Sequence, residues 1–102
     1  MKKNKFKIPK EYESYGLTIK VKYEPKLHEE HGRLGESRNA KRVIALQPRN
    51  NVVTQEDVGE TFCHELTHNI LDQMGEFEFS GNEKRVKDFS KLLHQFFVTA
   101  KY

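Results

Sequence analysis

The chain has 102 residues, a formal net charge of +3 and 35% hydrophobic residues, which predicts one domain with a modest core. Its single cysteine, Cys63, excludes an internal disulfide and fits a reducing compartment. No apolar run is long enough to span a membrane, and none follows the first lysines as a secretory signal requires. We therefore expect a cytoplasmic protein without a membrane partner.

The first segment, residues 1–12, is rich in lysine and is expected to form a flexible basic tail of the single domain 1–102. Phe6, Ile8 and Pro9 interrupt its lysines. A charge run usually forms a solvated surface, and no nucleic-acid-binding motif accompanies this one. Nucleic acid is therefore not an expected partner.

A small, mostly antiparallel sheet of about three strands is predicted from the next segments. Leu17–Tyr23 alternates between apolar and polar residues, as a half-buried strand does. Residues 33–37 and 41–47 are predicted to form a hairpin around Asn39 and Ala40.

Between these strands lies a polar segment, residues 27–32, which contains His28 and His31. The two histidines are three positions apart and no helix pattern surrounds them. This spacing favours a polar loop over a second metal site.

A long amphipathic helix is predicted over residues 55–74. Thr54 is a suitable N-cap, and Asp57 can complete a capping box with it. No proline interrupts the segment, and Gly75 follows as a stop signal. The apolar residues on one broad arc of this helix are expected to face the core: Val58, Phe62, Cys63, Leu66, Ile70 and Met74.

Within this helix, residues 64–68 form the motif His-Glu-Leu-Thr-His. Two histidines at i and i+4 lie one turn apart on one helical face, so both can reach one Zn²⁺ at roughly 2.0–2.1 Å. Glu65 projects beside the metal and can take a proton from water there, the general-base role in metalloproteases. The alternative is two surface histidines, His64 and His68, on an ordinary amphipathic helix.

A second amphipathic helix is predicted over residues 81–99, and its first turn offers a third zinc ligand, Glu83. Ser80 and Glu83 have the spacing of a capping box. Glu83 also shares the core-facing side with Val86, where a carboxylate is costly to bury without a partner such as zinc. The alternative is that Glu83 only closes the capping box. Four other residues remain rival ligands: Asp72, Glu76, Glu78 and His94. Asp72 could instead orient a histidine ligand.

The H-E-L-T-H motif, followed after a short loop by N-E-x-x-V-x-x-F-S-x-L-L, resembles the gluzincin metallopeptidases. More narrowly, the chain is similar to the small ImmA/IrrE-type metallopeptidases of phages and mobile elements over about residues 17–97. The resemblance is strongest over residues 61–93. It implies that His64, His68 and Glu83 bind Zn²⁺ and that Glu65 is the catalytic base. No residue of the chain matches a transition-state stabiliser, for which His94, Arg85, Tyr23 and Tyr102 are candidates.

Together these observations predict an α+β, minimal zincin-like domain. Its small sheet packs on the active-site helix, and a second helix carries the third ligand. The expected function is zinc-dependent peptide hydrolysis, with zinc as cofactor and Glu65 as general base. The expected partner is a protein or peptide substrate, such as a regulatory protein. The alternative function is a catalytically silent zinc-binding regulatory or interaction module. We expect a monomer, in the host cytoplasm if a phage encodes it.

Overall fold

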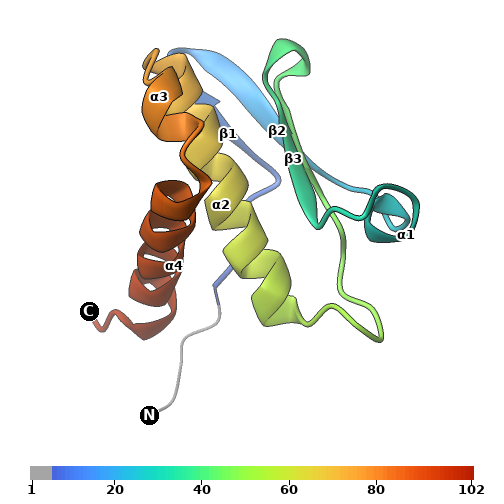
Figure 1. Cartoon of the computed structure of the whole chain (residues 1–102). Helices are drawn as coiled ribbons and strands as arrows, with labels where there is room; N and C mark the ends of the chain where they lie inside the picture. Colours follow the sequence, from blue (N-terminus) through green and yellow to red (C-terminus); the bar gives the residue numbers. More distant parts are fainter. Residues whose placement is uncertain (1–5) are drawn as a thin grey trace.

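The computed structural model describes residues 6–102 as an α+β fold with a four-stranded sheet (Figure 1). The elements in chain order are β1 Glu11–Ser14, β2 Leu17–Tyr23, α1 Leu27–His31, β3 Gly35–Arg38, the 3₁₀ turn η1 Asn39–Lys41, β4 Val43–Leu46, α2 Gln55–Gln73, α3 Phe77–Ser80 and α4 Glu83–Thr99. The helix α2 lies between the sheet and α4 (Figure 1). Both long helices and the strand β2 were predicted from the sequence and are confirmed.

The sheet has one strand more than expected, and it is mixed. Its order is β1-β2-β4-β3, with antiparallel pairs at both edges and a parallel pair between β2 and β4. The additional strand β1 pairs with β2 through a tight turn at Tyr15 and Gly16, whose φ angles are 49° and 74°. Positive φ at both central positions gives a hairpin turn whose twist matches that of the strands.

Part of the segment expected to form a flexible tail, residues 1–12, has a defined place in the structure, since Glu11 and Tyr12 belong to β1. Residues 1–5 lie outside the described part of the chain. Phe6 stacks on Phe97 with ring centroids 5.1 Å apart and also contacts the ring of Phe62. An aromatic side chain buries a large apolar area, so this contact anchors the segment that leads into β1.

The predicted hairpin is present as β3 and β4, and the η1 turn joins them. The turn needs no glycine because Arg42 adopts the left-handed conformation, with φ 55°. β3 lies at the edge of the sheet beside α2, whereas β4 lies in the interior. The segment predicted as a polar loop contains the short helix α1, on which His28 and His31 are exposed.

The helix α2 begins and ends where local signals predicted. The Thr54 side chain accepts a hydrogen bond from the Asp57 amide, and the Asp57 carboxylate accepts one from the Thr54 amide. Gly75 follows the helix with φ 76°. The core lies between the first half of α2 and the sheet and contains Ile19, Ile44, Leu46, Val53, Val58, Phe62 and Cys63. Ile70 and Met74 are exposed, so the predicted apolar arc is buried only in part.

The helix α4 begins later than predicted and buries a different face. Its N-cap is Asn82, whose side chain accepts a hydrogen bond from the Arg85 amide, so the capping box expected between Ser80 and Glu83 is wrong. The buried residues of α4 are Val86, Ser90, His94 and Val98. Although an amphipathic helix was predicted here, four of its apolar residues are exposed: Phe89, Leu92, Phe96 and Phe97. No helix within residues 6–102 is long and apolar enough to cross a lipid bilayer.

Candidate metal centre

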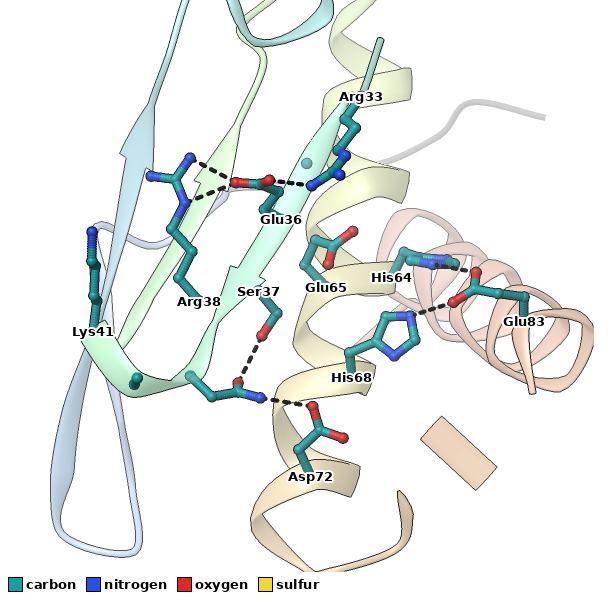
Figure 2. Close-up of a pocket in the computed structure, with 13 residues that line it drawn as sticks. Arg33, Glu36, Ser37, Arg38, Lys41, His64, Glu65, His68, Asp72 and Glu83 are labelled. Carbon is teal, nitrogen blue, oxygen red and sulfur yellow. Dashed lines mark hydrogen bonds and ion pairs between the residues drawn. The ribbon is translucent and has the colours of Figure 1, made fainter. Parts of the chain in front are cut away.

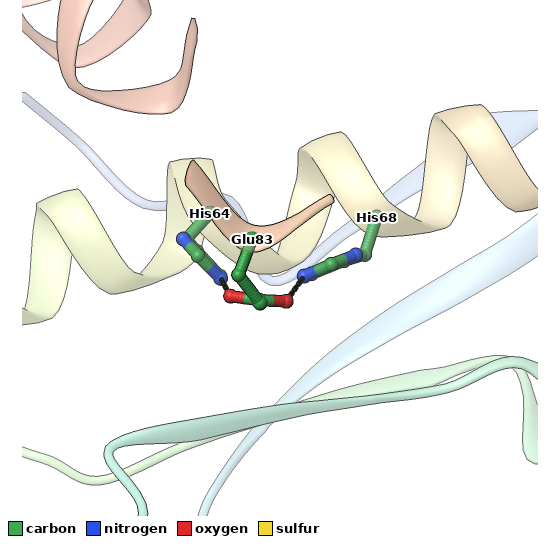
Figure 3. A group of neighbouring side chains, drawn as sticks. All are labelled: His64, His68 and Glu83. Atoms are coloured by element: carbon green, nitrogen blue, oxygen red, sulfur yellow. Dashed lines mark ion pairs between the residues drawn. The ribbon is translucent and has the colours of Figure 1, made fainter. Parts of the chain in front are cut away.

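Two histidines from α2 and one glutamate from α4 converge on one point (Figure 3). His64 Nε2 lies 3.2 Å from Glu83 Oε2, and His68 Nε2 lies 2.9 Å from Glu83 Oε1. One ligand atom from each residue lies within 4.8 Å of the others. Two ligands of a tetrahedral zinc ion, each at roughly 2.0–2.2 Å, are themselves about 3.4 Å apart. The separations and the donor types, two imidazole nitrogens and a carboxylate oxygen, therefore fit a zinc site.

Glu83 reaches this point for a reason other than the one predicted. It is the first residue of α4, and 68% of its side-chain surface is exposed. The expectation that it is a core-facing, buried carboxylate is therefore wrong. Its position follows from the chain direction: α3 and Asn82 turn the chain so that the first turn of α4 faces the histidines of α2.

Ser80, at the end of α3, contacts the second ring nitrogen of His68. Its Oγ lies 3.0 Å from His68 Nδ1, and the residue is buried. A partner on the second nitrogen fixes the ring orientation and the tautomer of a metal-binding histidine. The sequence had suggested Asp72 as the residue that orients a histidine. The Asp72 carboxylate instead accepts a hydrogen bond from Asn39, and Ser80 was missed because it was assigned to a cap.

Glu65 points from α2 into the cleft, toward β3 (Figure 2). Burial raises the pKa of Glu65 to about 7; the charge of His68 opposes this rise, and those of Glu83 and Glu36 add to it. The backbone of Ser37 also hydrogen-bonds to the carboxylate and favours its charged form. A cation bound by His64, His68 and Glu83, the triad, would oppose this rise and lower the pKa of Glu65, because a nearby positive charge stabilises a carboxylate.

A glycine allows β3 to approach α2 beside Glu65. A Cβ atom placed on Gly35 would lie 2.6 Å from Thr61 Cγ2 and 3.0 Å from Glu65 Cγ. The first distance is shorter than real carbon contacts permit. Any other residue at position 35 would therefore require Thr61 to change rotamer or β3 to move away from the helix.

The triad opens onto a cleft of about 920 Å³ between β3, the η1 turn and α2 (Figure 2). Arg38, on the β3 side, forms ion pairs with Glu24 and Glu36 at 2.5 and 2.7 Å. Hydrogen bonds from Arg38 lower the pKa values of both carboxyl groups. Arg33 also pairs with Glu36, so much of the charge on this wall is neutralised within the wall itself.

A hydrogen-bond network fixes the far end of the cleft. Asn39 donates to Asp72 at 2.7 Å and accepts from Asn69 at 3.1 Å, and Asn69 accepts from Tyr12 at 2.7 Å. Asn69 is only 2% exposed. Because the buried amide of Asn69 is satisfied only when Tyr12 and Asn39 are in place, this network favours one arrangement of the segments that it joins. It links the η1 turn and β1 to the turn of α2 that follows His68.

The remaining candidates lie elsewhere. Within residues 6–102, the only group of metal-ligating side chains close enough to share an ion is His64, His68 and Glu83. Among the candidate stabilisers, His94 packs edge-on against Phe6 and Arg85 lies over the ring of Phe79. Tyr23 lines a different cavity, beside His94. None of these candidates, nor Tyr102, lines the cleft at the triad.

Comparison with protein-family models, with curated proteins and with solved structures gave no match to this chain.

Proposed function

We propose that the protein is a zinc-dependent metallopeptidase with a minimal zincin-like fold. The observation that supports this most directly is the convergence of His64, His68 and Glu83 at the mouth of a cleft that also contains Glu65. Catalytic zinc sites use three protein ligands and leave one position for water or substrate. In the chain, Glu83 follows the histidine motif and is the first residue of the next long helix, α4. This order supports the resemblance to gluzincins of the ImmA/IrrE type.

Zinc bound at this site would polarise a peptide carbonyl and lower the pKa of water at the metal to about 7. Glu65 would accept the proton of the attacking water and deliver it to the leaving amine. Its carboxylate is held for this task by the Ser37 backbone and lies inside the cleft. General acid–base transfer by a positioned carboxylate contributes about 10²–10⁴-fold to a rate.

The substrate is proposed to bind as an extended strand along the free edge of β3. Leu34 accepts a hydrogen bond from the Gln47 amide, so alternate residues of β3 pair with β4. Gly35 and Ser37 lie between these pairs and direct their backbone groups to the free edge. The Ser37 N–H already donates to Glu65, so its carbonyl is the group that remains for a substrate. β4 pairs on both sides, with β2 and β3, so the edge that can accept a strand in this hairpin is that of β3.

The test is metal analysis combined with a peptidase assay on the same preparations. Wild-type protein is expected to bind about one zinc ion per chain, and His68→Ala and Glu83→Ala should lose most of it. Glu65→Gln should keep the zinc and lose about 10²–10⁴-fold in hydrolysis. Removing the metal with a chelator should abolish cleavage, and adding zinc should restore it.

The outcomes separate the proposed function from its alternative. Full zinc occupancy in Glu83→Ala would remove Glu83 from the ligand set. Stoichiometric zinc in wild-type protein without cleavage of any peptide would favour a catalytically silent zinc-binding module. Unchanged hydrolysis in Glu65→Gln would exclude Glu65 as the base.

A further inference from the structure

A second, smaller cavity adjoins the triad on the side opposite the η1 turn. It has a volume of about 250 Å³ and lies between the start of β3, α2 and α4. It shares Gly35, His64 and Glu65 with the main cleft. A side chain next to the bond held at the triad can therefore enter this cavity.

The inner wall of the cavity is mostly apolar. Leu34 is partly buried and packs against the core. Gly35 carries no side chain, and Thr61 approaches it with its methyl group. The Thr61 hydroxyl is directed elsewhere, because it donates a hydrogen bond to the Asp57 carbonyl at 2.7 Å. This wall suits methylene groups rather than a short polar side chain.

The α4 wall of the cavity carries two lysines one helical turn apart, Lys87 and Lys91. Among residues 6–102, no carboxylate oxygen lies within 4.0 Å of the amino nitrogen of either lysine. Lys84 on the same helix does pair, with Asp88 at 3.1 Å. Both lysines are therefore outside the ion pairs formed among the described residues.

The acidic residues of the cavity lie on the opposite wall. Glu60 and Glu65 line it from α2, whereas α4 contributes only Ser90 beside the two lysines. The positive charge is therefore confined to the α4 wall. The β3 side of the main cleft differs in this respect, because Arg33 and Arg38 pair with its acids.

We propose that this cavity is a specificity pocket that selects a glutamate side chain next to the scissile peptide bond. The methylene groups of the glutamate would lie on Leu34 and Thr61, and its carboxylate would reach Lys87 and Lys91. The inference rests on the proposed peptidase function, because it assigns the substrate class of the same site. It adds a residue preference that the metal triad does not itself supply.

The experiment uses the full chain with one equivalent of zinc and four peptides. Mass spectrometry of a random peptide mixture first identifies a bond that the protein cleaves. The four peptides then carry Glu, Gln, Leu or Lys at one residue that flanks this bond, and the series is repeated for the flanking residue on the other side. Exposed ion pairs are weak, so we expect kcat/KM to favour Glu over Gln by about three- to tenfold. The preference should shrink in high salt, because rim charges are screened.

The charge reversal Lys87→Glu combined with Lys91→Glu should invert the order and favour the Lys peptide. Lys101→Glu makes the same type of change outside both cavities and should leave the order as in wild-type protein. Equal kcat/KM for the Glu and Gln peptides would overturn the proposal while leaving the peptidase function intact. An order that survives the double reversal would do the same.

A binding measurement keeps the inference testable if no peptide is cleaved. Addition of the four peptides to isotope-labelled protein should shift the amide signals of Leu34, Thr61 and Lys91 most with the Glu peptide. Absence of cleavage together with this binding pattern would overturn the peptidase function and retain the pocket. Identical shifts with the Glu and Lys peptides would overturn the pocket.

Discussion

The two helices that supply the triad hold their proposed zinc ligands in different ways. The helix α2 is packed between the sheet and α4, and its two histidine side chains are only 24% and 17% exposed. The helix α4 supplies Glu83 from its first residue, with 68% of the side-chain surface exposed. Two ligands are thus held by the core, and the third depends on the α3–α4 junction. The folded core and the complete metal site should therefore respond to different substitutions.

The largest expected effect lies in the core at α2. Phe62 is 3% exposed, whereas Phe89 on α4 is 51% exposed. Phe62→Ala should lower the free energy of unfolding by about 3–5 kcal/mol, because it leaves a cavity between α2 and the sheet. Phe89→Ala should cost about 1 kcal/mol or less. Urea denaturation followed by circular dichroism measures both, and similar losses would show that α4 is as integral to the core as α2.

A second prediction concerns the junction that joins the two helices at the site. Ser80→Ala removes the hydroxyl that contacts His68 Nδ1 and should lower zinc affinity by about 10–100-fold. Ser90, equally buried on α4, hydrogen-bonds only to the Lys87 carbonyl among the bonds of the described residues. Ser90→Ala is therefore the matched control and should leave zinc affinity unchanged. Competition with a chromophoric chelator measures both affinities.

The two regions also differ in how far the sequence predicts them. The two ends of α2 can be predicted from the local signals at Thr54, Asp57 and Gly75. That His64 and His68 lie on one face of the helix can be predicted from their spacing. Neither prediction depends on the rest of the fold, which is why the sequence was sufficient for both. The convergence of His64 with Glu83 was anticipated, although burial was the wrong argument for it.

The buried face of α4 could not be predicted from hydrophobic periodicity. Ser90 and His94 are buried, and His94 fits because the facing residue of α2 is Gly59, where an added Cβ would lie 2.8 Å from His94 Nε2. Such a fit between two helices is a tertiary property. β1 was missed for a related reason: its sequence Glu-Tyr-Glu-Ser carries one apolar side chain, and its pairing depends on the turn at Tyr15.

Substitutions at the N-caps of the two long helices are expected to have effects of intermediate size. Thr54→Ala and Asn82→Ala each remove a side-chain acceptor at an N-cap and should each cost about 1 kcal/mol of stability. Only Asn82→Ala should also weaken zinc binding, because it loosens the turn that begins with Glu83. Thermal unfolding and the chelator competition distinguish the two effects. Equal zinc affinities in the two variants would mean that the cap does not position the third ligand.

The smallest effect is confined to alkaline pH and tests the network that anchors α2 to β1. Burial raises the pKa of Tyr12 from 10.0 to about 12, and its hydroxyl donates a hydrogen bond to Asn69. Between these two pH values the unfolded chain releases the phenol proton while the folded chain retains it. The folded state therefore binds more protons, and its stability must fall as pH rises through this window.

Tyr12→Phe should be less stable at neutral pH, because it leaves Asn69 without this donor, but it should lack this part of the alkaline slope. Denaturation midpoints of both proteins between pH 9.5 and about 11 measure the difference in slope. Parallel slopes would show that Tyr12 ionises equally easily in the folded and unfolded chains.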